Sequence, residues 1–547
     1  MRRPALVIFA AVAASGAVIL AGTSGAQSPP GSPRPFSVVE ATLAGMQAAM
    51  ADGRTSSRDI VQQSLTRIAL YEDRLNAVMT VNARALDEAD ERDRERRAGR
   101  IRGPLHGIPI ALKDNIHTTD MPTTGGALAF AGLVPPYEAT LTRQLRDAGA
   151  IVIAKTVMTE LANWVAPGMP TNYSALAGFA FNPYDPRRDP RLAGFDGRPV
   201  LPTGGSSSGG GTAASFWAAN VGTETSGSIL SPANQNMLVG IKPTVGRISR
   251  YGVIPITADQ DTPGPMARTV ADAATLLGVL ESAQPDPQDA ATSACTAPPA
   301  RDYTRYLDAA ALKGARIGVP RAFYYDPAEL SGTRGAIGGL RGTEREVMQD
   351  AIAVLRERGA TLVDPADIPS VMAADRARNA LAWNPCSGQG DAKGQDDDCS
   401  VVFKYGMKRD FTAWLESLGA RAPVRTLAEL RAWNEAHRNG GALKYGQAQL
   451  DISDEMDLRA DEARYKADRT RDLELSRTEG IDAVMREHRL DALLFPGGGG
   501  ALIARRRGSL QAPPVNATPN GAGLALNPSG SGAAGFGIRP NGTITVG

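Results

Sequence analysis

The segment Pro202–Pro243 reads PTGGSSSGGGTAASFWAANVGTETSGSILSPANQNMLVGIKP and contains two serine-glycine clusters, Gly204–Gly211 and Ser226–Ser228. Glycine loses more conformational freedom on folding than any other residue, so such density indicates a special backbone requirement. Closely spaced main-chain N–H groups can converge on an anion. A flexible linker is the alternative, but linkers rarely contain large apolar residues such as Phe216 and Trp217. We therefore expect this segment to form a folded site.

Three catalytic interpretations of this segment compete. A phosphate-binding loop requires Gly-Lys-Ser/Thr after its glycines, which is absent here. Gly205–Gly209 matches the G-x-S-x-G nucleophile elbow, with Ser207 as nucleophile and His488 as a candidate base. That elbow follows a strand, whereas Pro199 and Pro202 interrupt the preceding run. The third interpretation is a pair of serines, one in each cluster, served by a lysine.

The third interpretation coincides with a family resemblance. The motifs GGSSSG from Gly204, GTETSGSI (Gly222–Ile229) and GIKPT (Gly240–Thr244) resemble those of the amidase signature family. Members of this family use a Ser–Ser–Lys triad, in which a serine with a cis peptide bond lies between the base and the nucleophile. The resemblance implies a lysine upstream, and GPLHGIPIALKDNI (Gly103–Ile116) resembles the family's lysine motif.

The resemblance also implies a role for each residue of the site. Lys113 is the base, Ser206 is the relay, and Ser228 is the nucleophile. The peptide bond between Gly205 and Ser206 would be cis. The oxyanion and substrate carbonyl would be bound by the backbone N–H groups of Thr225, Ser226, Gly227 and Ser228.

Lys113 can act as a base only when it is neutral. The apolar run Ile108–Leu112 predicts a buried strand. Burial at its end would lower the pKa of Lys113. Asp114 would oppose that shift if it faced the amine, so we expect it to point away. Lys155, at the end of the second apolar run Ala150–Ala154, is the alternative candidate for the base.

The resemblance implies an α/β amidase-signature fold over residues 36–496, with a mixed central sheet, helices on both faces and a helical cap. Apolar periodicity predicts helices over 37–50, 57–71, 140–149, 269–282 and 344–358. Two charged stretches, 425–437 and 455–489, would form the cap. Short apolar runs predict strands over 108–112, 150–155, 315–320, 361–363 and 490–496.

Both ends of the chain differ in composition from its centre. Arg2 and Arg3 precede an apolar run, and small residues near Ala26 offer a cleavage site, so residues 1–26 are typical of a signal peptide. We expect a periplasmic or secreted protein without stable membrane insertion after cleavage, although an uncleaved anchor is the alternative. Residues 497–547 are rich in Gly and Pro and predict a poorly ordered tail.

Cysteine usage fits an exported protein. Cys386 and Cys399 flank a polar loop that a disulfide would hold compact, and Cys295 would remain unpaired. None of the three has the spacing of a zinc site.

These features predict an exported amidohydrolase that cleaves the C–N bond of a small carboxamide or peptide amide through an acyl-enzyme, without metal or cofactor. A net charge of +1 argues against nucleic-acid binding. The oligomeric state is left open. The rivals are the Ser207–His488 esterase, an amidotransferase subunit, and a catalytically impaired member that acts as a binding protein.

The impaired member is considered because the interval from Ser206 to Ser228 is shorter than in most of the family. If the triad is intact, the missing residues should lie at a helix end, near Ala219–Asn220, because a loss within a helix would rotate everything that follows it.

Overall fold

The computed structural model describes residues 35–191, 196–205, 208–329, 335–388, 393, 396–497, 503, 524–526, 537–538 and 544–545. Contacts divide the chain into two units, Met1–Phe36 and Ser37–Gly547. All described helices and strands belong to the second unit. The proposed signal peptide, residues 1–26, lies outside the described residues.

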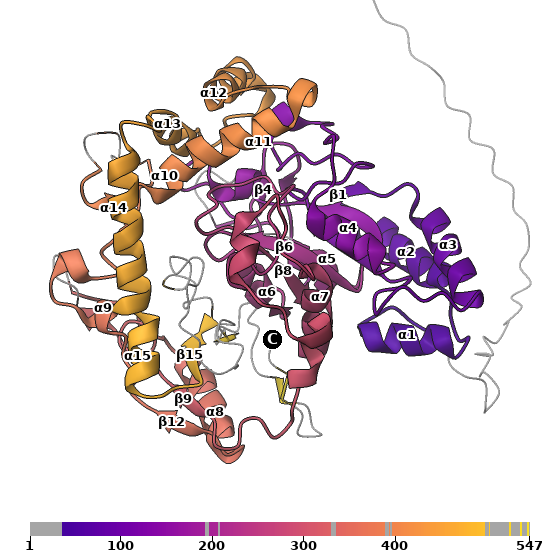
Figure 1. Ribbon diagram of the computed structural model, residues 1–547, viewed down its shortest axis with the longest axis horizontal. Helices are drawn as coiled ribbons and strands as arrows, with labels where there is room; N and C mark the ends of the chain where they lie inside the picture. The colour runs from indigo at the N-terminus through magenta and orange to yellow at the C-terminus, as the bar shows by residue number, and fades with distance from the viewer. Residues whose placement is uncertain are drawn as a thin grey trace, which may run out of the picture. The chain divides into compact units, whose positions relative to one another are not determined.

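The helices account for most of the regular structure (Figure 1). They are α1 (Leu43–Ala51), α2 (Ser57–Leu75), α3 (Ala85–Arg97), α4 (Thr140–Asp147), α5 (Ser208–Ala213), α6 (Leu230–Gln235), α7 (Val270–Leu280), α8 (Thr343–Glu357), α9 (Pro369–Met372), α10 (Val402–Gly406), α11 (Thr412–Ser417), α12 (Leu427–Ala436), α13 (Ala448–Asp454), α14 (Glu462–Leu473) and α15 (Ile481–Glu487).

The central sheet has six strands in the order β1-β3-β2-β6-β8-β7. Their bounds are β1 (Val78–Val81), β2 (Pro109–Lys113), β3 (Ile151–Thr156), β6 (Ala219–Glu224), β7 (Val239–Gly240) and β8 (Thr262–Ala267). The strands β3, β2 and β6 run parallel, whereas β1, β8 and β7 pair antiparallel with their neighbours, so the sheet is mixed. Helix α2 contacts β2, and α3 contacts β3. Helices α4 and α7 pack against each other, and α4 contacts β3 while α7 contacts β7 and β8.

A smaller sheet is parallel throughout, in the order β12-β9-β15-β16. It contains β9 (Arg316–Gly318), β12 (Thr361–Val363), β15 (Ala492–Pro496) and β16 (Leu524–Leu526). The strand β16 belongs to the C-terminal segment, where the sequence predicted no packed element. Most of that segment lies outside the described residues, so the expectation of a poorly ordered tail stays a prediction.

The remaining strands form two-stranded pairs. They are β4 (Tyr173–Ser174) with β5 (Gly178–Phe179), β10 (Ala328–Glu329) with β11 (Ala336–Ile337), β13 (Asn384–Pro385) with β14 (Cys399–Ser400), and β17 (Gly537–Ile538) with β18 (Ile544–Thr545).

The five strands predicted from apolar runs are confirmed as β2, β3, β9, β12 and β15. The stretch 455–489 is helical over α14 and α15, which are separated by a π-helical turn at Glu474–Thr478 and the non-helical Gly480. One expectation was wrong. Ala219–Asn220 is not a helix end: α5 ends at Ala213, and Ala219 begins β6.

The strand β8 lies within the sheet although it contains Pro263 and Pro265, and the sequence did not predict it. Proline cannot donate a ladder hydrogen bond and is rare in central strands. The two prolines are two positions apart, so their missing donors face the same neighbouring strand. The loss of hydrogen bonds is therefore confined to one side of β8.

A helical cap is formed by α10 to α14, of which α12 and α14 lie in the stretches predicted for it. The end of the second stretch, α15, packs instead in the core of the smaller sheet. Its apolar side chains, including Phe403, Phe411 and Trp414, join a hydrophobic core with Phe130 and Trp164, which precede the serine clusters in the chain. The cap thus packs on the segments 127–133 and 161–181.

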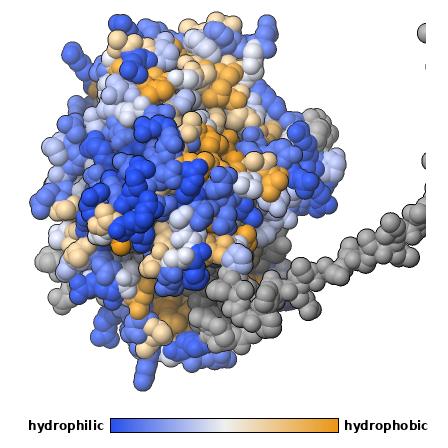
Figure 2. Space-filling view, turned by 90° about the vertical axis from the view of Figure 1, so that its right-hand side faces the viewer, coloured by the Kyte–Doolittle hydropathy of each residue, from blue (hydrophilic) through white to orange (hydrophobic). Residues whose placement is uncertain are grey.

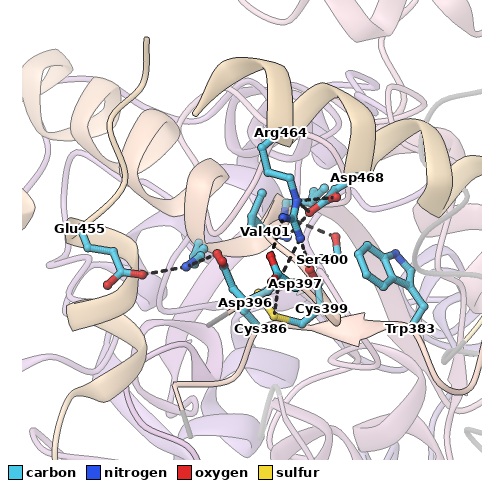
Figure 3. The surroundings of a disulfide bond; sticks show 12 residues. Trp383, Cys386, Asp396, Asp397, Cys399, Ser400, Val401, Glu455, Arg464 and Asp468 are labelled. Atoms are coloured by element: carbon cyan, nitrogen blue, oxygen red, sulfur yellow. Dashed lines mark hydrogen bonds and ion pairs between the residues drawn. A yellow bond between two sulfur atoms is a disulfide. The ribbon is translucent and has the colours of Figure 1, made fainter. Parts of the chain in front are cut away.

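The Cys386–Cys399 disulfide predicted from the sequence is present, and Cys295 is free. Figure 3 shows that the bond lies beside α14. Arg464 of α14 pairs with Asp468 at 2.9 Å and donates a hydrogen bond to the carbonyl of Cys399 at 3.2 Å. The carboxylate of Asp468 also accepts from the Val401 N–H at 3.0 Å. These hydrogen bonds hold the segment Cys399–Val401, which precedes α10, against α14, and the disulfide ties the same segment to Cys386.

Figure 2 shows one face of the protein, which is mostly hydrophilic with hydrophobic groups scattered among the polar ones. No helix in the described ranges is long and apolar enough to cross a membrane.

We predict that the double substitution Cys386→Ser with Cys399→Ser lowers the free energy of unfolding by about 3 kcal/mol, because cross-linking a loop of this length restricts the unfolded chain. Thermal unfolding of the oxidised protein measures the change. The single substitution Cys295→Ser is the control and should leave the midpoint within about 1 °C. Equal midpoints for the wild type and the double variant would contradict the prediction.

Candidate active site

The candidate site lies at the carboxyl ends of two parallel neighbours, β2 and β6. Leu112 of β2 is opposite Val221 of β6, so Lys113 and the segment that follows Glu224 emerge at the same edge of the sheet. Ligand sites in α/β sheets characteristically lie outside the carboxyl ends of the strands. Lys113 and Ser228, which are far apart in the sequence, are brought to one edge by this pairing.

Lys113 is the last residue of β2, and its side chain is completely buried. Its Nζ donates hydrogen bonds to the carbonyl oxygen of Thr223 at 3.1 Å and to Thr223 Oγ1 at 3.0 Å. Burial lowers the pKa of Lys113 to about 7, although the charges of Asp261 and Glu224 act to raise it. A substantial fraction of this amine is therefore neutral at neutral pH, as a general base requires.

Ser228 lies on the turn between β6 and α6, and its neighbour Gly227 has a φ of +93°. That left-handed conformation favours glycine. A Cβ placed on Gly227 would find no atom within 4 Å, so the turn is open on that side. The turn contains Thr225, Ser226, Gly227 and Ser228, the four residues predicted to bind the oxyanion.

The first serine cluster meets the second at Gly205. A Cβ placed on Gly205 would lie 2.7 Å from Ser228 Oγ, which is closer than real Cβ contacts allow. A Cβ on Gly204, which has a φ of +82°, would lie 2.6 Å from the backbone nitrogen of Pro232 in α6. The two glycines are thus required because the backbone must approach the Ser228 hydroxyl and the start of α6 closely.

The carbonyl group of Gly205 is itself held in place. Thr159 Oγ1 donates a hydrogen bond to this carbonyl oxygen at 3.0 Å and accepts one from the Asn172 N–H at 2.7 Å. Both side chains are buried. The residue that precedes Ser206 in the chain is therefore fixed against the segment 159–172.

Glu224 holds the segment that follows the nucleophile. Its Oε2 accepts hydrogen bonds from the N–H groups of Ile229 at 2.8 Å and Leu230 at 3.0 Å. These are the first N–H groups of α6, which otherwise lack partners within the helix. The carboxylate of Asp261 holds the start of the same turn, because it accepts a hydrogen bond from Thr225 Oγ1. Burial raises the pKa of Asp261 to about 7.

Two of the predicted residues cannot be placed. Ser206, the proposed relay, and Ser207, the nucleophile of the rival elbow, both lie outside the described residues. Their neighbour Gly205 is described, and it brings the chain next to Ser228.

Lys155, the alternative base, forms an ion pair with Asp114. Its Nζ lies 3.4 Å from Asp114 Oδ1, and both side chains are fully buried. It also donates to Thr123 Oγ1 at 2.7 Å. Asp114 is thus turned toward Lys155, in agreement with the expectation that it points away from the Lys113 amine.

The histidines have other surroundings. His488, the base of the rival mechanism, ends α15, and its backbone carbonyl accepts from Arg316 at the start of β9. His437 stacks on Trp433 with ring centroids 3.8 Å apart. His117 Nε2 accepts from Trp414 Nε1 at 2.9 Å, and burial lowers its pKa to about 3.

Sequence reasoning missed Thr223, Glu224, Thr159, Asn115 and Asp261, which surround the predicted catalytic groups. Thr223 and Glu224 lie within the motif Gly222–Ile229, which was recognised as a whole. Nothing in the sequence distinguishes a residue that holds Lys113 from one that binds substrate. Thr159, Asn115 and Asp261 belong to segments whose contacts arise only on folding.

Comparison with known proteins agrees with this fold. The family model described as Amidase matches residues 59–507. A protein of Arthroderma benhamiae named "Putative amidase" is 33% identical over 441 residues, which cover 80% of this chain and 67% of that protein.

Two solved structures are also similar. The native peptide amidase from Stenotrophomonas maltophilia has a TM-score of 0.71 and 36% identity, covering 86% of this chain and 89% of that one. A peptide amidase in complex with the competitive inhibitor chymostatin has a TM-score of 0.69 and 38% identity, covering 84% of each chain.

The fold and the matched relatives define a hydrolase that acts on amides. The chain belongs to the amidase signature family, as the motifs at Lys113 and in both serine clusters predicted.

We predict that Gly205→Ala reduces amide hydrolysis by roughly 100-fold or more, because the added methyl group would displace the Ser228 hydroxyl and small misplacements at a reacting centre are costly. Initial rates on a peptide amide measure the loss. Gly210→Ala is the matched control: it lies in α5, its Cβ would approach no atom closer than 3.6 Å, and it should keep full activity. Equal activity of the two variants would contradict the prediction.

Proposed function

We propose that this amidase cleaves the C–N bond of a small carboxamide or peptide amide through a Ser-Ser-Lys triad. Lys113 is the base, Ser206 is the relay and Ser228 is the nucleophile. The observation that supports this best is the buried Lys113 amine, which is bonded to β6 five residues before Ser228 and has a lowered pKa. The approach of Gly205 to the Ser228 hydroxyl supports the place of Ser206 in the relay.

In this mechanism the neutral amine of Lys113 takes a proton from the hydroxyl of Ser206, which in turn takes the proton of Ser228. Ser228 Oγ attacks the carbonyl carbon of the substrate, and N–H groups of the turn at Thr225–Ser228 bind the oxyanion. The proton returns through Ser206 to the leaving nitrogen as the C–N bond breaks, leaving an ester on Ser228. Water hydrolyses this ester along the same path. The scheme requires no metal or cofactor.

The names of the similar structures support the substrate class. Both are peptide amidases, and one is bound by a competitive inhibitor. The similarity covers 84% of this chain for one structure and 86% for the other. We therefore favour a peptide amide or a similar small amide over a macromolecular substrate.

Export is part of the proposal. Residues 1–26 have the composition of a signal peptide, and the Cys386–Cys399 disulfide fits an oxidising compartment. Sequencing the N-terminus of the mature protein from cell fractions tests export, and we expect the mature chain to begin at Gln27 in a periplasmic or secreted fraction. A cytoplasmic chain that keeps its N-terminus would contradict it.

The triad is tested by substitution and by pH. We predict that Ser228→Ala and Lys113→Ala each lower kcat by roughly 10³-fold or more, since the members of a triad act as a unit. Wild-type activity should rise with pH through about 7, because the neutral Lys113 amine is the active form and its pKa is about 7. Rates on a panel of amides, peptide amides and esters across the pH range measure both effects.

Two substitutions serve as controls for the rival mechanism. Ser207→Ala and His488→Ala should keep most of the activity, because neither residue belongs to the proposed proton path. If His488→Ala were as inactive as Ser228→Ala, the esterase mechanism would be favoured and the triad assignment would be wrong.

A further inference from the structure

The Lys113 amine is held from one side by a single residue. Its Nζ donates to Thr223 O at 3.1 Å and to Thr223 Oγ1 at 3.0 Å. A neutral amine has two N–H donors and one lone pair. When both donors face Thr223, the lone pair is directed away from β6. An amine fixed in this way presents its basic electron pair in one direction only.

The hydroxyl of Thr223 is fixed in turn by Asn115. Asn115 Nδ2 donates to Thr223 Oγ1 at 3.0 Å and to the carbonyl of Ile254 at 3.3 Å. A hydroxyl oxygen has two acceptor lone pairs, and here Lys113 and Asn115 occupy both. The orientation of the amine thus depends on a hydroxyl that a second side chain holds in place.

Asn115 also borders a small polar cavity of about 10 Å³, which is lined by Thr223, Thr225 and Asp261 among others. This is about the room that one water molecule needs. Within the described part of the chain Asn115 Oδ1 has no hydrogen-bond partner, and the side chain is only 2% exposed. The amide group is therefore anchored through its nitrogen, and the residue borders this cavity.

The carboxylates near the Lys113 amine have other hydrogen-bond or ion-pair partners. Asp261 and Glu224 act on Lys113 through space, and both carboxylates accept hydrogen bonds from backbone N–H groups. Asp114, the next residue in the chain, pairs with Lys155. Lys113 Nζ donates instead to the two uncharged oxygens of Thr223, which stabilise an ammonium less than a carboxylate would.

We propose that Thr223 and Asn115 are positioning residues of the amidase, which fix the direction in which the neutral Lys113 amine presents its lone pair. This inference rests on the proposed function, because it assumes that Lys113 is the base. In this inference the hydroxyl of Thr223 orients the Lys113 amine without contact to the substrate. Asn115 acts indirectly, because it orients the Thr223 hydroxyl.

The test compares Thr223→Val, which keeps the shape but removes the hydroxyl, with Thr223→Ser, which keeps the hydroxyl. Thr223→Val should lower kcat roughly tenfold or more while KM stays within about twofold, because the effect is on proton transfer rather than substrate binding. It should also move the midpoint of the acidic limb to lower pH, since losing an acceptor destabilises the ammonium more than the amine.

Thr223→Ser should restore both kcat and the midpoint to near wild-type values. Asn115→Ala should change them in the same direction as Thr223→Val but less. It provides the same readouts if Thr223→Val fails to fold, which circular dichroism would detect.

The outcomes separate this inference from the function on which it rests. If Lys113→Ala is inactive but Thr223→Val has wild-type kcat, or loses kcat with an unmoved midpoint, the positioning role is wrong and the triad stands. If Lys113→Ala keeps wild-type activity, the triad itself fails. A lowered kcat with a midpoint at lower pH, rescued by Thr223→Ser, supports the inference.

Discussion

The site depends on one buried amine. Removing Lys113 from water disfavours its ammonium form, and that desolvation outweighs the two nearby carboxyl groups in setting its pKa. The fold produces this burial by ending β2 inside the sheet, between β3 and β6. A base with a pKa near neutrality is the condition for activating a serine hydroxyl without a histidine.

Close backbone contact is the second constraint. The chain at Gly204 and Gly205 passes so near to Pro232 and Ser228 that no side chain fits. Glu224 then fixes the first N–H groups of α6, so the turn that carries Ser228 is held from both sides. The glycines at positions 204 and 205 are thus explained by the close approach of the chain to Pro232 and to the Ser228 hydroxyl.

Much of the site could be predicted from the sequence, and the limits have physical causes. Lys113 and Ser228 could be proposed because their motifs are local in the chain, and β2 and β3 could be predicted because continuous apolar runs mark buried strands. The strand β8 was missed because its prolines argue against a central strand, and β6 because its composition resembles that of the adjacent loop. The pairing of Asp114 with Lys155, and the bonds of Thr159 and Asn115, join separate segments and have no local signal.

The charge state of Lys113 is the most direct test of this account. The chain has nine lysines, so the pH titration of each can be followed by NMR after ¹³Cε labelling, and the Lys113 signal can be assigned by its loss in Lys113→Met. The account predicts that this signal titrates near pH 7 in the folded enzyme, well below the ordinary lysine value of about 10.4. A Lys113 amine that stays protonated up to about pH 10 would contradict it.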